Sequence, residues 1–368
     1  MLGAGCGSAA GRHRNVRKNK ANTIAGAPAC AELVVKIAVL FGGVSAERDV
    51  SIASAAQVVR SLRVAGHDVL TVEMSRGLLS SEQERELLSQ GIDRAPPRDL
   101  AMAPGGLPAG IGSGRLTEVD LVFLALHGGA GEDGTVQGAL DLAGIRYTGS
   151  GMLGSALAMD KDIAKRLLLA AGVPTPKWLM VPVDPARVVD ELGLPVIVKP
   201  NSQGSTVGLT LVREASALPS AIEQAAAFDS EVMIEQYIPG RELTVGILEN
   251  IALAVGEIVP LTGEIFDYAA KYQADAAREI FPADVSAATA GSVQRLGLRA
   301  HQALKLSSYS RADFRMDPQG GLWCLEVNTL PGLTAGSLLP QSAAAAGISF
   351  EELCERICRA ALARPPGA

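Results

Sequence analysis

The sequence contains no long apolar segment. Its longest apolar run, residues 121–126, falls well short of the roughly 18 residues that a membrane-spanning helix requires. The basic N-terminal stretch is not followed by an apolar core, so a secretory signal peptide is excluded as well. With 48% hydrophobic and 20% charged residues, the 368-residue chain has the balance of a soluble globular protein, which excludes extensive disorder. At about 150 residues per domain, this length allows two to three domains.

Cysteine is scarce and irregularly placed. The five cysteines, an odd number, show no regular spacing and therefore no disulfide framework. Cys354 and Cys358 stand four residues apart on a predicted helix, and we interpret them as packing residues because no other metal ligands cluster near them. A metal or redox pair is the alternative. This cysteine usage fits a reducing cytoplasm, which is the expected location.

Several common nucleotide and hydrolase motifs are absent. The sequence has no G-x-x-x-x-G-K-[ST], H-E-x-x-H or G-x-S-x-G, and the first of these absences excludes a P-loop. One G-x-G-x-x-G occurs at residues 149–154. A nicotinamide site would also need an acidic residue about 20 positions later, and none lies between Asp162 and Asp184. A nicotinamide-dependent oxidoreductase is therefore a disfavoured alternative.

The charge is divided unevenly along the chain. Residues 1–35 carry five basic residues and one acidic residue, whereas the net charge of the whole chain is −6. The rest of the chain therefore has a net charge of −10, which argues against binding to a nucleic-acid backbone. We predict that residues 1–34 form a disordered basic extension or arise from a misassigned start. A transit segment is the alternative.

Hydrophobic periodicity predicts an alternation of strands and helices. Residues 35–41 form an apolar strand, Ser45 is expected to cap a helix that extends toward Ala65, and residues 69–72 form the next strand. This order is that of a βαβ unit. Further strands are predicted at residues 119–126, 195–199, 231–237, 242–248, 310–316 and 322–327, and further helices at 135–142, 160–171, 286–306 and 350–362. Two segments are predicted to be irregular, namely residues 76–118 and the lid-like loop 260–283.

Charged and amide side chains occupy alternate positions at the last two predicted strands. Arg311 and Asp313 share one face of the first strand, because successive strand residues point to opposite sides. Glu326 and Asn328 share one face of the second strand in the same way. If the two strands pair, their oxygen-bearing side chains form one acidic patch beside a guanidinium. Mg²⁺ is typically held by such carboxylates together with substrate phosphates. A solvated salt-bridge surface is the alternative.

Three further motifs favour ligand binding near strand ends. Lys199 is followed by the polar loop 201–208, in which backbone N–H groups and the lysine charge can cradle phosphates; an ordinary polar hairpin is the alternative. His127 begins a stretch of eight residues with four glycines, which permit unusual backbone angles where α/β sheets bind ligands. Glu47 follows the glycines after the first strand, where its charge either binds a ligand or only stabilises a helix dipole.

Taken together and in this order, these motifs resemble the D-alanine–D-alanine ligases of the ATP-grasp superfamily. The resemblance extends from about residue 36 to residue 362. The matching strings are LFGGVSAERDVS (40–51), LHGGAGEDGTVQGAL (126–140), YTGSG (147–151), AMDKDIAK (158–165), VIVKPNSQGSTVG (196–208), FDYAAKY (266–272), SRADF (310–314) and LEVNTLPGLT (325–334), followed by Ser337 and Leu338.

The resemblance implies an α/β fold and an enzymatic activity. The fold is that of a three-domain ATP-grasp ligase, with an N-terminal parallel-sheet α/β domain (35–158), a central ATP-grasp α+β subdomain (159–240) and a C-terminal one (241–364) carrying an omega lid (260–283). The activity is ATP-dependent ligation of two D-alanines to D-alanyl-D-alanine through an acyl phosphate, for peptidoglycan precursor synthesis in cell wall biogenesis. ATP and two Mg²⁺ or Mn²⁺ ions are implied, together with a homodimer and neither a nucleic-acid nor a membrane partner.

The resemblance also implies roles for individual residues. The catalytic residues are Glu47, Ser205, Tyr272, Arg311 and Gly332, and the substrate-binding residues are His127, Ser337 and Leu338. The ATP-binding residues are Lys161, Lys199, Glu235, Gln236, Ile238, Glu242 and Lys271, and the metal ligands are Asp313, Glu326 and Asn328. In this scheme Glu47 binds the ammonium of the first substrate and forms a hydrogen-bonded set with Ser205 and Tyr272.

Two positions depart from the family, Gln236 and Ser308, of which the second is expected to be harmless, and two alternatives stay open. Gln236 stands where the family often has lysine, which puts one adenine-side hydrogen bond in doubt. A ligase that takes D-lactate second is the nearest alternative, but such relatives lack the lid pair present here as Lys271 and Tyr272. A non-catalytic ATP-binding protein would be expected to have lost one of the four charged or amide residues of the last two strands, and none is lost.

Overall fold

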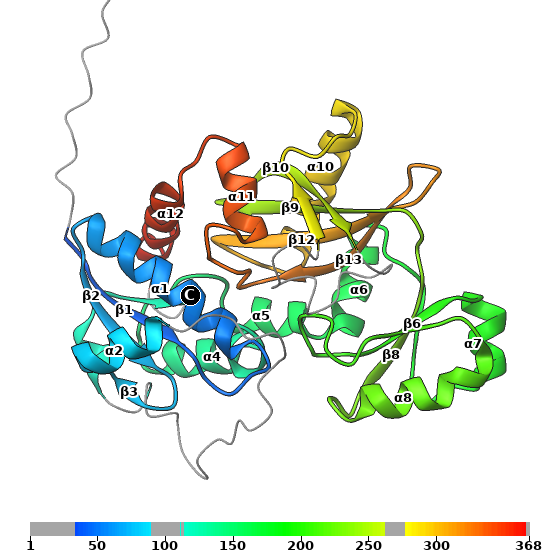
Figure 1. The fold of residues 1–368 in the computed structure, drawn as a ribbon, viewed down its shortest axis with the longest axis horizontal. Helices are drawn as coiled ribbons and strands as arrows, with labels where there is room; N and C mark the ends of the chain where they lie inside the picture. The colour runs from blue at the N-terminus through cyan, green and yellow to red at the C-terminus, as the bar shows by residue number, and fades with distance from the viewer. Residues whose placement is uncertain (1–33, 90–110, 112–113, 262–276, 366–368) are drawn as a thin grey trace, which may run out of the picture. The chain divides into compact units, whose positions relative to one another are not determined.

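The computed structural model of the chain describes residues 34–89, 111, 114–261 and 277–365. The strands in these ranges form three sheets, each built from strands that are consecutive in the chain (Figure 1). Three main clusters of buried apolar side chains pack against these sheets, and the cluster at the first sheet also includes Leu248, Leu253 and Tyr309 of the third. All but the last residue of the predicted basic extension lies outside the described residues.

The first sheet has the strand order β3-β2-β1-β4. Its strands are β1 (Lys36–Phe41), β2 (Asp68–Glu73), β3 (Gly77–Leu78) and β4 (Leu121–Leu124). β1 lies parallel to β2 and β4, and α1 (Arg48–Val64) connects β1 to β2, which confirms the predicted βαβ unit. Five of the six residues of β1 are buried and apolar, as expected for a central strand of a parallel sheet.

The predicted start of α1 is wrong by a few residues. Glu47, not Ser45, is the N-terminal boundary residue of this helix, and no side chain caps it. The Ser45 hydroxyl instead donates to the carbonyl of His127 at 2.6 Å and accepts from the backbone N–H of Glu47 at 3.2 Å. Ser45 does not act as the predicted cap because its side chain instead joins the loop after β1 to the loop that follows β4.

The prediction of an irregular segment at 76–118 is also wrong in part, because α2 (Ser81–Leu88) forms within it. A capping box begins this helix, in which Ser80 Oγ accepts from Gln83 N and Gln83 Oε1 accepts from Ser80 N. The signal is readable in the sequence as Ser-x-x-Gln. Only one side chain of α2 is buried, so the helix carries little of the hydrophobic periodicity that identifies longer helices.

The second sheet has the order β5-β8-β6-β7 and is antiparallel throughout. Its strands are β5 (Trp178–Met180), β6 (Val196–Pro200), β7 (Thr210–Val212) and β8 (Val232–Gln236). The helices α7 (Pro185–Leu192) and α8 (Leu218–Ala226) lie beside it and bury Val188, Leu218 and Ala221 in its apolar cluster (Figure 1). The predicted strands at 195–199 and 231–237 are confirmed as β6 and β8.

The third sheet has the order β11-β10-β9-β12-β13. Its strands are β9 (Arg241–Leu248), β10 (Ile251–Pro260), β11 (Ala277–Ile280), β12 (Tyr309–Met316) and β13 (Leu322–Asn328), and α10 (Ala287–Ala303) packs against it. β11 lies inside the segment predicted to be irregular and pairs with β10. The remainder of the predicted lid, residues 262–276, lies outside the described residues.

Two short helices join the sheets. They are α5 (Met152–Met159) and α6 (Lys161–Ala170). The glycine-rich motif at 149–154 runs into α5, and a Cβ added to Gly154 would lie 2.9 Å from the carbonyl oxygen of Lys305. This glycine therefore permits close packing of α5 against the loop after α10, which accounts for it without a nicotinamide cofactor.

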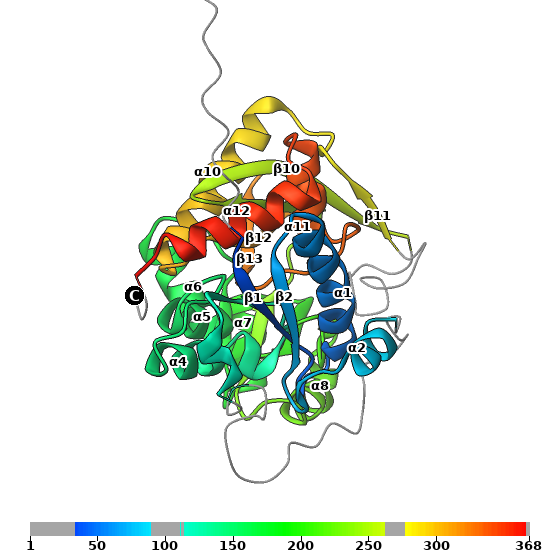
Figure 2. The same cartoon turned by 90° about the vertical axis from the view of Figure 1, so that its left-hand side faces the viewer.

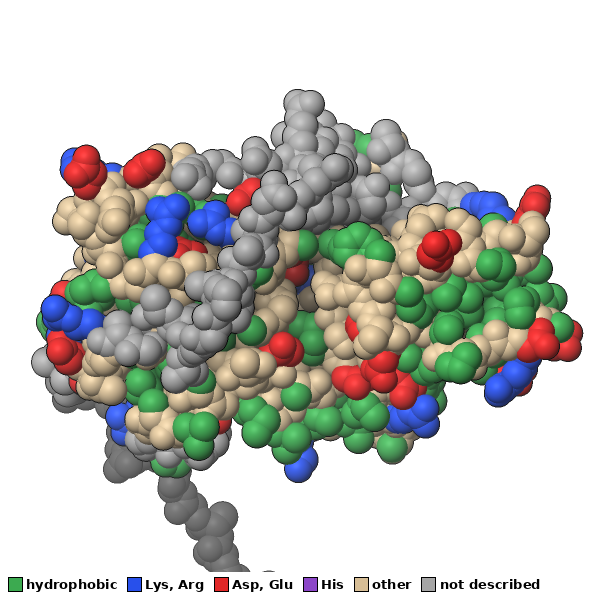
Figure 3. Space-filling model, turned by 90° about the horizontal axis from the view of Figure 1, so that it is seen from below, with side chains coloured by type: hydrophobic (Ala, Val, Ile, Leu, Met, Phe, Trp, Pro, Cys, Tyr) green, Lys and Arg blue, Asp and Glu red, His purple; other side chains and the backbone are tan. Residues whose placement is uncertain are grey.

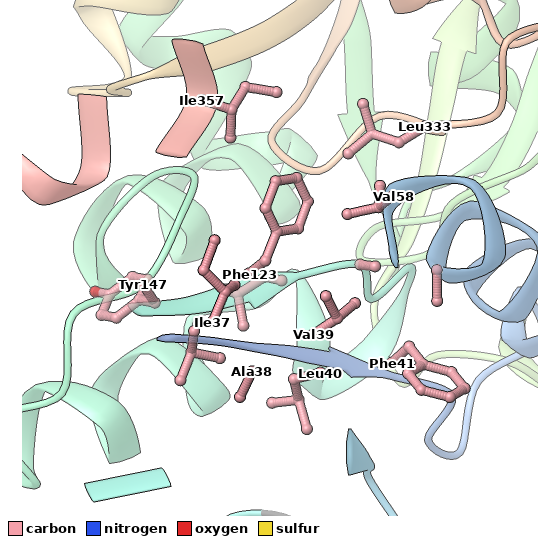
Figure 4. Packing of buried hydrophobic residues seen from close by; sticks show 14 of the residues in the cluster. Ile37, Ala38, Val39, Leu40, Phe41, Val58, Phe123, Tyr147, Leu333 and Ile357 are labelled. Carbon is pink, nitrogen blue, oxygen red and sulfur yellow. The ribbon is translucent and has the colours of Figure 1, made fainter. Parts of the chain in front are cut away.

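Of the last two helices, the first contacts β9 and β10 of the third sheet, and the second contacts α1 and β4 of the first sheet. They are α11 (Leu338–Ala345) and α12 (Phe350–Leu362), and α12 lies beside α1 (Figure 2). Ile357 of α12 and Leu333 of the loop after β13 point into the same core as Phe123 of β4 (Figure 4). Cys354 and Cys358 lie buried in this cluster, which confirms their interpretation as packing residues. No helix among the described residues is long and apolar enough to cross a membrane.

A buried histidine beneath the third sheet predicts a pH dependence of stability. His301 of α10 is fully buried, and its Nδ1 lies 2.7 Å from Ser310 Oγ. Burial lowers the pKa of His301 to about 4 from an ordinary value of 6.5. Below pH 6.5 the unfolded chain therefore binds a proton that the folded chain does not, so stability is lost as the pH falls toward 4.

Because of His301, we expect the free energy of unfolding of the wild-type protein to fall by about 2–3 kcal/mol between pH 6.5 and pH 4. The variant His301→Gln cannot take up this proton and should lose correspondingly less over the same interval. Urea unfolding of both proteins across this pH range measures the difference. Parallel pH profiles for the two proteins would contradict the assignment.

Candidate functional site

A cleft of about 960 Å³, partly open to solvent, is lined by residues of the second and third sheets. The predicted site residues that line it are Lys161, Lys199, Glu235, Gln236, Ile238, Glu242, Arg311, Asp313, Glu326 and Leu338. A smaller hollow of about 340 Å³ shares Lys161, Gln203 and Glu326 with the cleft and extends it toward Glu132 and Asn328. Residues predicted from widely separated motifs are thus brought to one place.

The pairing of the last two strands is confirmed. Arg311 of β12 stands opposite Asn328 of β13, and Asp313 stands opposite Glu326. The register then shifts, so that the next residue of β12 pairs with Cys324. This bulge lets the adjacent residues Leu325 and Glu326 both line the cleft, although neighbouring residues of a regular strand point to opposite faces.

The Asp313 carboxylate is the centre of a hydrogen-bonded group. It accepts from Arg311 Nε and Nη2 at 2.9 and 2.8 Å, from Thr244 Oγ1 at 2.7 Å and from Asn328 Nδ2 at 2.9 Å. Thr244 belongs to β9, which pairs with β12, and sequence reasoning did not identify it. These donors keep the carboxylate in a defined orientation at the edge of the cleft.

The donor set at this position fits a magnesium site by its chemistry. Asp313, Glu326 and Asn328 offer two carboxylates and one amide oxygen, which are ligand types that Mg²⁺ accepts. The described residues contain no cluster of three His, Cys, Asp or Glu side chains suited to a metal ion, and here the third member is an asparagine.

The opposite wall of the cleft presents two lysines. Asp160 caps α6 by accepting from Ile163 N, and Asn201 donates to Asp160 Oδ1 and accepts from Asp162 N, each at 2.9 Å. The loop after β6 is therefore tied to the start of α6, which brings Lys161 close to this loop. Its ammonium donates to the carbonyl of Gln203 at 2.6 Å and lies 3.7 Å from Glu326 Oε2.

Lys199 and Glu235 form an ion pair at the base of the cleft. Lys199 Nζ donates to Glu235 Oε2 at 2.8 Å, and the other carboxylate oxygen accepts from Lys165 Nζ at 2.5 Å. Burial favours a raised pKa for Glu235, but the charges of the two lysines outweigh it and keep this pKa below its ordinary value. Burial also lowers the pKa of Lys165 to about 8, against the opposing effect of Glu235. Sequence reasoning did not identify Lys165, although it follows Lys161 by one helical turn.

The segment after β8 carries the residues predicted to contact adenine and ribose. Gln236 and Ile238 line the cleft, and the carbonyl of Ile238 accepts from Arg315 Nε at 3.0 Å. Arg315 Nη1 also lies 3.4 Å from Glu242 Oε2. Arg315 of β12 thus joins this segment to β9, and sequence reasoning did not identify it.

Glu47 lies between two loops that are far apart in the sequence. Its carboxylate accepts a hydrogen bond from Ser205 Oγ. A Cβ added to Gly128 or Gly204 would lie 2.9 or 2.7 Å from Glu47 Oε2, so both glycines leave room for the carboxylate. The third member of the predicted set, Tyr272, lies outside the described residues, as does the predicted lid lysine, Lys271.

We expect Gly204→Ala to disturb the position of Glu47. The added methyl group would approach Glu47 Oε2 to 2.7 Å, and the side chain must move away from Ser205 to relieve this contact. A displacement of about 1 Å near reacting groups costs about 10²-fold in rate, so kcat/KM should fall by about that factor. The control is Gly291→Ala, a glycine on α10 whose added Cβ meets only the end of Arg295. Unchanged steady-state kinetics for Gly204→Ala would contradict this placement.

His127 and Glu132 attach the loop after β13 to the first sheet. His127 Nδ1 lies 2.8 Å from the carbonyl of Leu330, and Nε2 lies 3.0 Å from Ser54 Oγ. Glu132 accepts from Gly128 N at 2.8 Å and from Leu330 N at 3.0 Å. Burial lowers the pKa of His127. Burial, with a further contribution from the charge of Glu47, raises the pKa of Glu132.

The loop held in this way contains the remaining predicted residues. A Cβ added to Gly332 would lie 2.7 Å from Ser337 Oγ, so the two residues are in close contact. Ser337 precedes α11, and its hydroxyl accepts from Thr334 N at 3.2 Å. Leu338 lines the cleft, so this loop connects the first sheet with the cleft of the other two. Sequence reasoning missed Glu132, whose signal is a carboxylate inside a glycine-rich loop that exposes backbone N–H groups.

Comparison with known proteins agrees with this geometry. Models of the D-ala D-ala ligase N-terminus and C-terminus match residues 36–150 and 167–359. The D-alanine–D-alanine ligase of Citrifermentans bemidjiense is 43% identical over 89% of this chain and 96% of its own length. That of Gloeobacter violaceus is 41% identical over 88% and 98%.

Solved structures show the same similarity. A D-alanine–D-alanine ligase from Bacillus anthracis complexed with ATP is 32% identical over 89% of this chain and 97% of its own, with a TM-score of 0.69. The VanG D-Ala:D-Ser ligase of Enterococcus faecalis is 31% identical over 89% and 99%, with a TM-score of 0.72. The predicted three-domain ATP-grasp fold is confirmed, whereas the predicted domain boundaries stay predictions. The chain belongs to the D-alanine–D-alanine ligase family.

Proposed function

We propose that this chain joins two D-alanine molecules to D-alanyl-D-alanine at the expense of ATP, for the synthesis of peptidoglycan precursors. The observation that carries the proposal is the arrangement of β12 and β13. Their paired residues direct Asp313, Glu326 and Arg311 into a cleft whose opposite wall holds two lysines. Carboxylates, an arginine and lysines converging on one cleft suit a reaction that moves a phosphoryl group between anions.

The chemistry requires activation of a carboxylate. The carboxylate of the first D-alanine attacks the γ-phosphorus of ATP, the bond from this phosphorus to the ADP oxygen breaks, and an acyl phosphate forms. The amine of the second D-alanine then attacks the acyl carbon through a tetrahedral oxyanion. The C–N bond forms, phosphate leaves with its electron pair, and the amine gives up a proton.

The lysines and acids of the cleft serve the phosphoryl transfer. We propose that Lys161 and Lys199 hold the phosphates of ATP, because charge neutralisation and positioning dominate this reaction. Asp313, Glu326 and Asn328 would hold the Mg²⁺ ions, which supply further neutralisation of phosphate charge when bound. Gln236, Ile238 and the neighbouring Glu235 and Glu242 are proposed to hold adenine and ribose.

The groups near the reacting carboxyl are proposed to act on the amino acids. Glu47, held by Ser205, binds the ammonium of the first D-alanine near His127, and Tyr272 completes this set. Arg311 and the backbone N–H of Gly332 stabilise the tetrahedral oxyanion, for which one donor contributes about 3–4 kcal/mol in comparable sites. Ser337 and Leu338 receive the carboxylate of the second D-alanine. Lys271 reaches the γ-phosphate from the lid, which keeps water from the acyl phosphate.

The location and assembly of the protein are part of the proposal. The buried free thiols of Cys324, Cys354 and Cys358 suit a reducing compartment, which supports the cytoplasm. On the face seen in Figure 3, Lys and Arg are scattered among acidic side chains and do not form one continuous basic surface. This pattern supports a small-molecule enzyme rather than a nucleic-acid binder. The proposed homodimer is tested by sedimentation analysis of the full chain.

Phosphate release from ATP in the presence of Mg²⁺ tests the proposed activity. The substrates compared are D-alanine, L-alanine, D-alanine with D-lactate and D-alanine with D-serine, with product masses measured in each case. We expect phosphate release with D-alanine alone and a product with the mass of the dipeptide. Absence of turnover with every alanine, despite measurable binding of ATP, would overturn the substrate assignment. A preference for D-lactate or D-serine as second substrate would overturn only the assignment of D-alanine as the second substrate.

A further inference from the structure

Lys165 is a charged residue that the proposed reaction does not use. It is 1% exposed and lies on α6, one helical turn after Lys161. Its ammonium donates to Glu235 Oε1 at 2.5 Å and to Thr175 Oγ1 at 2.7 Å, and lies 5.1 Å from the centre of the Trp178 ring. It is absent from the lining of the cleft, so an effect on ATP must pass through another residue.

The residue through which it can act is Glu235. One carboxylate oxygen of Glu235 accepts from Lys165, and the other accepts from Lys199, which lines the cleft. Two anchors at opposite ends of one carboxylate fix its orientation. The Glu235 carboxylate therefore links Lys165 on α6 to Lys199 on β6, and this link fixes the position of the Lys199 ammonium.

The charges of this group explain why a buried lysine is present. Removing an ammonium from water is strongly unfavourable, and Lys165 recovers this cost only through its partners. Glu235 and Lys199 alone would form a neutral pair, in which the carboxylate cancels the charge offered to a phosphate. With Lys165 the group of three carries one net positive charge, as a site for a polyanion requires.

We propose that Lys165 is a positioning residue for nucleotide binding. It holds Glu235 in place and compensates its charge, so that Lys199 faces the phosphates of ATP with its own charge uncancelled. This inference rests on the proposed function, in which Lys199 contacts ATP. It assigns to Lys165 an effect on ATP affinity and not on the recognition of D-alanine.

Calorimetric titration of the full chain with the Mg²⁺ complex of a non-hydrolysable ATP analogue tests the proposal. We expect Lys165→Met to raise the Kd of the analogue at least 10-fold, while the KM for D-alanine changes less than 3-fold. The double variant Lys165→Met/Glu235→Gln loses one positive and one negative charge. No carboxylate then cancels the positive charge of Lys199. The Kd of the double variant should therefore lie within about 3-fold of that of Glu235→Gln alone, in contrast to the at least 10-fold effect of Lys165→Met on the wild type. The matched control is Lys177→Met, which removes an exposed lysine of the neighbouring loop.

The outcomes separate this inference from the proposed function. A folded wild-type protein that does not bind the analogue would overturn the proposed function and this inference with it. Wild-type binding with Lys165→Met within 2-fold of it would overturn the inference alone. Thermal melting shows whether the single variant folds, and if it does not, the double variant decides. A folded double variant that binds at least 10-fold more weakly than Glu235→Gln alone would overturn the inference, because Lys165 would then act by packing and not through the charge of Glu235.

Discussion

Glu326→Gln is expected to lower turnover by about 10³-fold or more, since charge stabilisation by a bound metal contributes several kcal/mol to such reactions. The carboxylate lies on β13 opposite Asp313 and is one of the residues that would hold the metal ions. Glutamine has nearly the same shape but one neutral oxygen, so the change removes charge and keeps packing.

The fold should tolerate this substitution. The Glu326 side chain is 25% exposed, and Lys161, whose ammonium lies 3.7 Å from it, also donates to a backbone carbonyl and stays paired. Phosphate release at saturating substrate gives the turnover, and thermal melting checks the fold. Glu223→Gln on the exposed surface of α8 is the matched control. Turnover of Glu326→Gln within 10-fold of the wild type would refute the metal assignment.

Arg311→Met should reduce kcat by about 10²–10³-fold, the usual effect of removing one donor that stabilises an oxyanion. Arg311 is 12% exposed at its side chain and makes two hydrogen bonds to Asp313. Its planar fork is held beside the proposed reacting carboxyl by this pair. Removal of Arg311 should therefore slow the chemical step. Binding of the ATP analogue does not include this step and does not detect the change.

A separate measurement distinguishes this effect from a disturbed metal site. Asp313 keeps Thr244 and Asn328 as donors when Arg311 is removed, so its position should hold. The affinity for the magnesium complex of the analogue is then expected to change less than 3-fold. Arg187→Met, at an exposed arginine of α7, is the control. If analogue affinity falls as steeply as kcat, Arg311 acts on the metal site and its proposed oxyanion role is wrong.

Much of the fold follows from patterns that neighbouring residues carry. The apolar run of β1, the glycines after it and the periodic helix α1 together predict a βαβ unit, because burial of a central parallel strand demands continuous apolar residues. The alternation of Arg311 and Asp313 likewise predicts a shared face. Where periodicity is weak, as in the short α2 and in β11, the same reasoning fails.

Most of the candidate site was predictable only because its motifs resemble a known family. The residues that sequence reasoning missed share one property: their role is defined by a partner far away in the chain. Lys165 reads as an ordinary helical lysine until Glu235 is placed against it. Glu132 reads as one more polar loop residue until the N–H of Leu330 reaches it.

The order of the elements, the shared faces of the polar strand residues and the types of ligand they offer can be read from the sequence alone. These depend on local periodicity and on side-chain chemistry, which a chain carries wherever it folds. The three-dimensional structure is needed to show that Ser45 joins two loops and does not cap a helix, that β13 bulges at the residue just before Glu326, and that three charged residues form one buried group at the base of the cleft. Each of these depends on a contact between segments distant in sequence, and the free energy of such a contact exists only when both partners are in place.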